Sequence, residues 1–190
     1  MSTVRPTGLD IQWPTDDSTR VPYEVFSDAD IYEVELTKIF SGAHWTYLAL
    51  SQEIPEPGDF TTTYVGERCV VVNRGEGGEV NAFENRCAHR GARVVPRLRG
   101  NAKQFNCPYH MWCYDHGGKL KAVPQQTGVK GKGGMPADFE LSNHNLTSLK
   151  TETYKGMIFG TFADEIMPLT EYLGPALVTQ IDRIFARPLR

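Results

Sequence analysis

The sequence predicts a mostly β protein: an antiparallel β domain with helices at both ends. Between about residues 43 and 162 the chain consists of short runs rich in Val, Thr, Tyr and Phe. Gly, Pro and Asn separate these runs, as turn residues separate strands. Before and after this stretch, apolar residues recur at helical spacing instead. Two short loops rich in Cys and His lie within the β region, and they predict a small metal-binding subdomain.

Length, charge and hydropathy exclude several classes of protein. A chain of 190 residues is long enough for one core with a small appendage. The net charge of −3 gives no indication of nucleic acid or an anionic membrane as a partner. No run of about 18 apolar residues occurs, so we expect no membrane-spanning helix. The polar segment 1–27 lacks the apolar core of a secretory signal, which predicts a cytoplasmic protein whose four cysteines are not paired as structural disulfides.

The N-terminal helix is predicted to begin after Asp28, whose carboxylate can cap it, and to end at Ser41-Gly42. Gly75–Gly78 and Lys155-Gly156 predict hairpin turns between neighbouring strands. The segment 125–145 has four glycines and no clear period, so we expect a long excursion on the surface. The predicted strands are 45–50, 60–65, 68–73, 80–84, 146–152 and 157–162.

From Pro168 onward the pattern is helical again, and Leu173-Gly174-Pro175 divides it, because proline suits the first turn of a second helix. The second helix has an apolar face, which predicts that a neighbouring domain covers it. We therefore predict a polar arm (1–27), a metal-binding β domain (28–165) and a helical segment (166–190) that leads toward a neighbouring domain absent from this chain. The apolar face consists of Ala176, Leu177, Ile181, Ile184 and Phe185.

Two ligand pairs carry the chemistry: Cys87-Ala88-His89 and Cys107-Pro108-Tyr109-His110. Each pair supplies one thiolate and one imidazole. In a Rieske 2Fe–2S cluster, one iron binds two thiolates and the other binds two imidazoles. Each loop would then give one ligand to each iron. We predict that loops 87–91 and 107–112 hold such a cluster, that it passes single electrons, and that its ligands are Cys87, His89, Cys107 and His110.

A structural zinc site with two Cys and two His is the competing metal site. Zinc-finger spacing usually places both cysteines in one pair and both histidines in the other, whereas here each pair is mixed. The sequence therefore favours the cluster. Two neutral imidazoles in place of two thiolates remove negative charge, so we expect a reduction potential of roughly −150 to +300 mV. The ring edges of the two histidines would be the exit for the electron.

Residues around the ligands resemble a known family, the Rieske domains of ring-hydroxylating oxygenase large (α) subunits. The group acting on aromatic carboxylates, with salicylate 5-hydroxylase, anthranilate dioxygenase and terephthalate dioxygenase, is the most similar. Met111 stands where the family commonly has glycine. Ala92 and Tyr109 stand where respiratory Rieske proteins have cysteines that form a disulfide. The resemblance covers nearly the whole chain and is carried by Cys87–Gly91, Cys107–Trp112, Tyr114, Gly133–Pro136 and Tyr172–Pro175.

The resemblance implies an electron relay from an NADH-dependent reductase, directly or through a ferredoxin, to a mononuclear Fe(II) that hydroxylates an aromatic carboxylate. It also implies other α subunits as partners, with or without a small β subunit. The histidines that remain do not form the two-His, one-carboxylate pattern of that iron. We therefore expect the iron and the catalysis in the absent domain. A stand-alone Rieske ferredoxin is the alternative, although such carriers are shorter and do not need the 125–145 excursion.

Several neighbours of the ligands have predicted roles. Arg90 is expected to face the adjoining catalytic domain, and Trp112 either shields the cluster or supports it by a hydrogen bond. Tyr114 completes the family pattern beside the cluster. A basic stretch is either a docking surface for an acidic electron donor or a solvated, partly ion-paired surface; it consists of Arg86, Arg90, Arg93, Arg97, Arg99 and Lys103. The remaining Cys and His residues are predicted to have ordinary turn, polar or packing roles. They are His44, Cys69, Cys113, His116 and His144.

Overall fold

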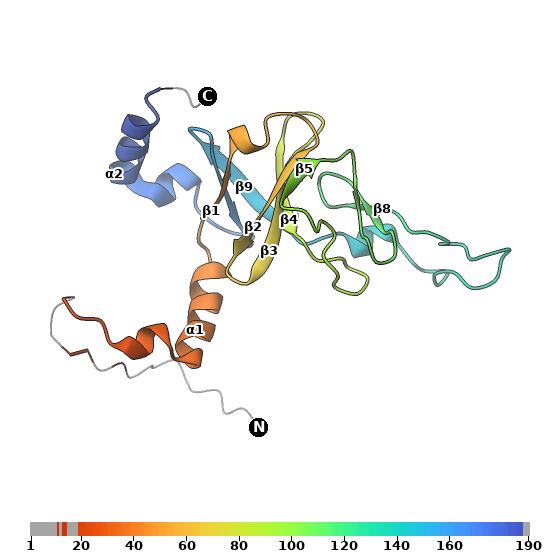
Figure 1. The fold of residues 1–190 in the computed structure, drawn as a ribbon, viewed down its shortest axis with the longest axis horizontal. Helices are drawn as coiled ribbons and strands as arrows, with labels where there is room; N and C mark the ends of the chain where they lie inside the picture. The colour runs from red at the N-terminus through yellow and green to blue at the C-terminus, as the bar shows by residue number, and fades with distance from the viewer. Residues whose placement is uncertain (1–10, 12, 15–18, 188–190) are drawn as a thin grey trace.

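A computed structural model describes residues 11, 13–14 and 19–187. The predicted arm 1–27 lies partly outside these described residues, as does the end of the segment 166–190. Two antiparallel sheets form the body (Figure 1), one with strand order β1-β10-β9-β4-β3-β2-β5 and one with order β6-β7-β8. The mostly β, antiparallel prediction is confirmed. The strands are β1 (Thr46–Leu50), β2 (Asp59–Val65), β3 (Arg68–Arg74), β4 (Val80–Glu84), β5 (Arg99–Asn101), β6 (Phe105–Asn106), β7 (Cys113–Tyr114), β8 (Leu120–Ala122), β9 (Ser148–Tyr154) and β10 (Met157–Thr161).

The larger sheet has apolar cores on both of its faces. In β3, Val70 and Val72 pack into one core, whereas Val71 packs into the other, which also contains the ligand loops. All three valines are completely buried. A continuous apolar run is what a strand covered on both faces requires. β1 and β2 also contact each other, so the sheet curls round its inner core. The predicted ligand loops therefore rest on the outer face of this sheet.

Both predicted hairpin turns are present. Gly75 and Gly78 lie between β3 and β4, where the Gly75 N–H donates to the carbonyl of Glu79 at 2.8 Å. Lys155 and Gly156 join β9 to β10 and have φ values of 51° and 84°. Two successive residues with positive φ are typical of a tight turn whose twist matches that of the strands. These turns fix the register of the central hairpins.

Three short helices precede the sheet: η1 (Tyr23–Phe26), α1 (Ala29–Glu35) and η2 (Leu36–Phe40). The predicted cap is confirmed, because the Asp28 carboxylate accepts hydrogen bonds from the N–H groups of Asp30 and Ile31 at 2.8 and 3.1 Å. The helix continues from α1 into a π-helical turn that ends at Ser41. Among the described residues, no helix combines the length and the apolar character needed to cross a membrane.

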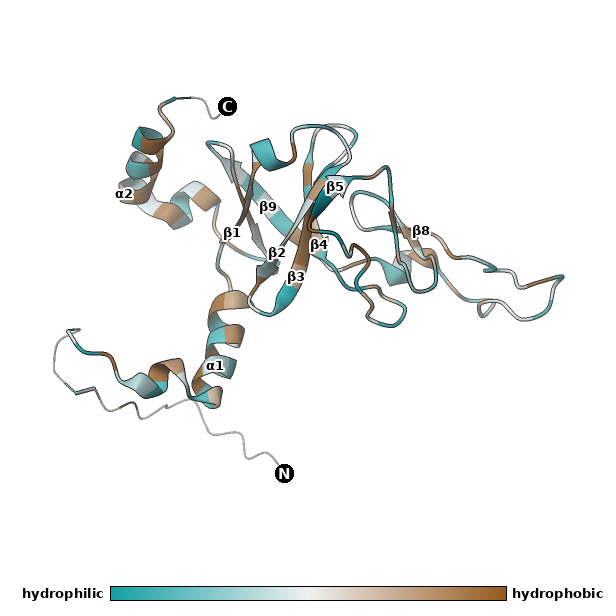
Figure 2. Cartoon of the chain, viewed as in Figure 1, coloured by the Kyte–Doolittle hydropathy of each residue, from teal (hydrophilic) through white to brown (hydrophobic). Residues whose placement is uncertain are grey.

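The C-terminal helix α2 (Leu169–Ile184) is kinked as predicted, because Gly174 has a φ of 71° and a ψ of 165° within it. Its first turn packs through Leu169 against Trp45 and Phe159. The part after the kink is attached through Asp182, whose carboxylate accepts a hydrogen bond from the Tyr154 hydroxyl at 2.8 Å. Apolar and polar residues alternate along this part (Figure 2), and the predicted apolar face is only partly covered.

The excursion between residues 125 and 145 extends away from the body beyond β8 (Figure 1). It then returns through the short helix η4 (Leu141–His144). On its way back, Met135, Phe139 and Leu141 pack against the core that contains the ligand loops. The predicted surface excursion is therefore confirmed for its outer part, while its returning end covers the predicted site.

Candidate metal centre

Two loops with the same backbone frame present the predicted ligands. In the first ligand loop (residues 87–92), the Cys87 N–H donates to the carbonyl of Ala92 and its carbonyl accepts from Gly91, at 2.8 and 2.9 Å. In the second ligand loop (residues 107–112), Cys107 makes the same two bonds to Trp112 and Met111, at 2.9 and 2.8 Å. The first loop follows β4, and the second connects β6 to β7.

The fourth position after each cysteine has a left-handed backbone, with φ of 74° at Gly91 and 58° at Met111. Glycine adopts this conformation without strain, whereas other residues do so at a cost of roughly 1–2 kcal/mol. The frame therefore explains why glycine suits this position. It also shows that Met111 keeps the same conformation despite its side chain, which is 54% exposed.

The two cysteine side chains lie together in the protein interior, with 3% of Cys87 and 2% of Cys107 exposed. Burial raises the pKa of the Cys107 thiol, and the adjacent Cys87 side chain raises it further, whereas backbone N–H groups of Tyr109 and His110 lower it. Both thiols are free. Metal binding must therefore displace the proton of the Cys107 thiol.

Tyr114 lies beneath this thiol pair and is fully buried. Its hydroxyl oxygen is 3.2 Å from the Cys87 sulfur, and it accepts a hydrogen bond from the Ala88 N–H at 3.3 Å. Because the oxygen already accepts from Ala88, its own proton is available to the sulfur. Burial, followed by the bond to Cys87, raises the pKa of Tyr114, so the hydroxyl stays protonated.

The two imidazoles lie together nearer the surface, with ring centroids 4.7 Å apart. His89 is exposed and His110 is half-buried. The Nδ1 atom of His110 is nevertheless buried and has no hydrogen-bond partner. A buried imidazole nitrogen without a partner is costly unless it binds something. Partial burial lowers the pKa of His89, and His110 and Arg90 lower it further, which favours the neutral ring that a metal needs.

The side chains are thus sorted by type, thiol beside thiol and imidazole beside imidazole. Among the described residues, no three His, Cys, Asp or Glu side chains form a group that could hold a single metal ion. A tetrahedral zinc site needs its four ligands at one point. A Rieske cluster needs only two protein ligands at each iron. The arrangement, together with the unpartnered Nδ1 of His110, fits the cluster better than zinc.

Aromatic rings surround the two imidazoles. The Trp112 indole, which is 3% exposed, stacks on His89 with centroids 4.7 Å apart and planes at 8°. The Tyr109 ring lies 3.9 Å from His110, and the Arg90 guanidinium lies 5.3 Å from the centroid of Tyr109. Of the two roles considered for Trp112, the stacking corresponds to shielding. Arg90 remains exposed, as a residue facing another domain would be.

Sequence reasoning missed the partners of Trp112 on its other side. Phe139 and His144, from the returning end of the excursion, both contact the indole. The sequence predicts an ordinary polar position for His144, because nothing in the local sequence connects it with Trp112. His116 lies in a turn as predicted, but it is buried and its Nε2 is 2.7 Å from the carbonyl of Ala102.

The other residues expected to be ordinary have contacts or burial that do not involve the proposed ligands. His44 lies 2.9 Å from the Tyr172 hydroxyl of α2. Cys69 is a half-buried residue of β3, where its sulfur accepts a hydrogen bond from Asn85 at 3.6 Å. Cys113 is buried in β7, as the packing interpretation predicted, and burial raises its pKa.

The basic stretch is divided between paired and exposed residues. Arg99 forms an ion pair with Glu53, and Arg93 donates a hydrogen bond to the Tyr64 hydroxyl at 2.8 Å. Arg86 and Arg90 instead line an open hollow of about 440 Å³ that includes His89. Arg97 and Lys103 are also exposed, so only part of the exposed basic charge lies beside the first ligand loop.

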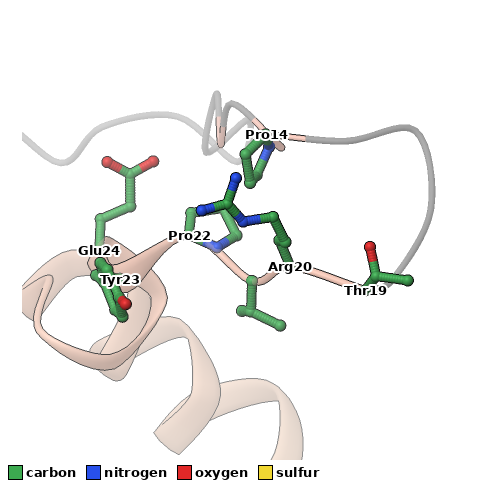
Figure 3. A pocket seen from close by; sticks show the side chains of 7 residues that line it. Pro14, Thr19, Arg20, Pro22, Tyr23 and Glu24 are labelled. Atoms are coloured by element: carbon green, nitrogen blue, oxygen red, sulfur yellow. The ribbon is translucent and has the colours of Figure 1, made fainter.

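A second hollow, of about 640 Å³, lies in the N-terminal segment (Figure 3). Pro14, Arg20, Pro22 and Tyr23 are among its lining residues, and all of the residues that line it precede α1. It contains none of the predicted ligands. We therefore assign it no part in the metal chemistry.

Comparison with known proteins identifies relatives over almost the entire chain. Residues 44–133 match the Rieske [2Fe-2S] domain family. The chain is 47% identical over 185 residues to the anthranilate 1,2-dioxygenase large subunit of Burkholderia cepacia, covering 97% of the chain and 44% of that relative. It is 46% identical over 180 residues to the large oxygenase component of salicylate 5-hydroxylase from Ralstonia sp, covering 93% and 43%.

Solved structures agree with these relatives. Naphthalene 1,2-dioxygenase from Rhodococcus sp., bound to indole, superimposes with a TM-score of 0.76 at 36% identity, covering 86% of the chain and 36% of that protein. The chain thus spans less than half the length of each of these relatives.

Proposed function

The chain contains a Rieske 2Fe–2S domain of the type found in ring-hydroxylating oxygenase large subunits, and on that premise we propose that it relays single electrons within such an oxygenase. A bound Rieske cluster supplies one-electron oxidation and reduction. The remaining question is what the residues of this chain contribute to the site.

We assign the four ligands as predicted from the spacing: Cys87, His89, Cys107 and His110. The observation that carries this assignment is the sorting of the side chains, with the thiols paired inside and the imidazoles paired near the surface. The buried, unpartnered Nδ1 of His110 supports it, because metal coordination would satisfy that atom. The identical backbone bonds of the two loops hold the cysteines in matching orientations.

The site is buried on its thiol side and open to solvent on its imidazole side. The thiol side is closed by Tyr114 and the sheet, so water and partners cannot approach it. The imidazole side reaches the surface through the exposed ring of His89. Electron transfer to and from partner proteins therefore takes place at the histidine side.

Arg86 and Arg90 support a proposal about the electron donor. Both are exposed beside His89, in the hollow next to the first ligand loop. An acidic surface on a reductase or ferredoxin would be attracted to them, which raises the rate of encounter and makes it sensitive to salt. We propose an NADH-linked reductase or a ferredoxin as this donor.

For the whole oxygenase, we propose that the electrons reach a mononuclear non-heme iron and that the substrate is an aromatic carboxylate. The names of the two relatives support this, since anthranilate and salicylate are both aromatic carboxylates. Further α subunits are the proposed partners of the assembled enzyme, with or without a small β subunit.

Metal analysis combined with EPR of the dithionite-reduced chain tests the proposal. We expect two irons per chain, no zinc and a rhombic Rieske signal. One zinc and no EPR signal in freshly purified protein would refute the electron-transfer function.

A further inference from the structure

The returning end of the 125–145 excursion touches the indole beside the cluster site. The rings of Phe139 and His144 lie 5.8 and 5.6 Å from the Trp112 ring, at interplanar angles of 77° and 74°. They also contact each other at 4.4 Å and 31°. Near-perpendicular ring contacts at these distances are attractive and directional. Trp112 is thus held by two rings that lie 27 and 32 residues further along the chain.

Trp112 in turn covers one face of His89. The two rings are almost parallel, at 8° and 4.7 Å. The indole is 3% exposed, whereas His89 itself is exposed. The torsion about the bond to an imidazole ring has a broad distribution, so contacts with neighbouring rings narrow the range of planes that the imidazole adopts. The plane of His89 therefore depends on where the indole is held.

We propose that His144 and Phe139 are positioning residues for the cluster: acting through Trp112, they fix the plane of His89 and exclude water from its covered face. The inference rests on the proposed assignment of His89 as a ligand. It gives the excursion a role in electron transfer, since cluster potential depends on solvent exposure and on residues that orient the ligands.

The direction of the effect follows from charge. Adding an electron makes the cluster more negative, and water stabilises the more highly charged form. Loss of the His144 ring admits water beside His89 and so raises the reduction potential. A coordinated ring whose tilt is less restrained by packing also samples a wider range of orientations, which broadens the EPR lines.

His144 makes a second contact, and the effect of that contact must be distinguished from the effect of ring packing on Trp112. Its Nδ1 lies 3.0 Å from the carbonyl of Glu140, the residue that precedes η4. Glutamine can keep this hydrogen bond without the ring, whereas phenylalanine keeps the ring without the hydrogen bond. The pair His144→Gln and His144→Phe therefore distinguishes ring packing from closure of the turn.

The experiment measures midpoint potential and EPR linewidth on the full cluster-loaded chain. We expect His144→Gln and Phe139→Leu to raise the potential and broaden the signal, and His144→Phe to match the wild type. His44→Gln is the control, because His44 also contacts an aromatic ring, that of Tyr172, which belongs to α2 and not to the ligand loops. Loss of the cluster in His144→Gln, with retention in His144→Phe, would also support the proposal.

Three results would overturn it: His144→Gln with wild-type potential and linewidth, His144→Phe behaving like His144→Gln, or loss of the cluster in both. The proposed function is tested separately by the wild-type spectrum. A wild-type chain without a Rieske signal refutes the proposed function, whereas a normal wild-type signal that His144→Gln leaves unchanged refutes only the positioning role.

Discussion

The two ligand loops share a backbone frame but differ in their surroundings. In each loop the cysteine bonds to the residues four and five positions further along, and in each the fourth residue is left-handed. The first loop, however, exposes His89 against a buried indole, whereas the second places half-buried His110 beneath exposed Tyr109. The common frame sets where the ligands point. The different surroundings decide which loop meets water and partner proteins.

The largest effect is expected from replacing the proposed cysteine ligand of the second loop. Cys107→Ser replaces a buried thiolate ligand by a poor iron ligand, and we expect iron content and the EPR signal to be lost almost completely. Cys113→Ser is the matched control, because Cys113 is also buried and lies in the adjoining strand β7. Iron content close to that of the wild type in Cys107→Ser would contradict the ligand assignment.

The next largest effect is expected on the reduction potential, from removing a hydrogen bond that only the first loop receives. Tyr114→Phe removes the hydroxyl beside the Cys87 sulfur and leaves the second loop intact. Fewer hydrogen bonds to sulfur lower the potential of a cluster. A bond of about 1 kcal/mol corresponds to a decrease on the order of 40 mV for one electron. Protein-film voltammetry or a dye titration measures this shift.

Tyr109→Phe serves as the control for that experiment. It removes a tyrosine hydroxyl from the second loop, on a side chain that is 55% exposed. We expect its potential to equal that of the wild type. Equal shifts in the two variants would mean that the hydroxyls act through general polarity and that the bond from Tyr114 has no special role.

These loops also show what a sequence can reveal. The four ligands could be proposed from the sequence because each pair lies within four residues, so that spacing alone brings a cysteine and a histidine together. The central strands and turns were predictable from apolar runs and glycines. The small sheet was missed, because β6 and β7 have only two residues each and such lengths carry no periodicity. The contacts of His144 were missed for a different reason: they join residues far apart in the chain, and only the folded path of the excursion brings them together.

A smaller effect is expected from exchanging the residue types at the shared left-handed position. Gly91→Ala places a side chain at a φ of 74°, and we expect the melting temperature of the loaded chain to fall by roughly 2–4 °C, equivalent to about 1 kcal/mol. Met111→Gly relieves the same strain, although glycine adds freedom to the unfolded chain. We therefore expect a rise of only about 1–2 °C for Met111→Gly. Shifts of the same sign in both variants would contradict the prediction that glycine is the preferred residue at this position of both loops.

The smallest effect concerns the exposed imidazole of the first loop in the metal-free chain. Its pKa is lowered by partial burial and by the neighbouring His110 and Arg90, so it lies below the unfolded value of about 6.5. The unfolded chain then binds more protons in this range, and stability rises with pH. The contribution of His89 to the free energy of unfolding is therefore complete above pH ~6.5 and decreases as the pH falls through that value.

Urea denaturation at several pH values measures this contribution as the difference between the wild type and His89→Gln. If the free energy of unfolding depends on pH in the same way in the two proteins, the prediction that the fold lowers the pKa of His89 is wrong. A profile that is flatter for His89→Gln would show that the fold already holds His89 in the neutral form that a metal requires, before any iron arrives.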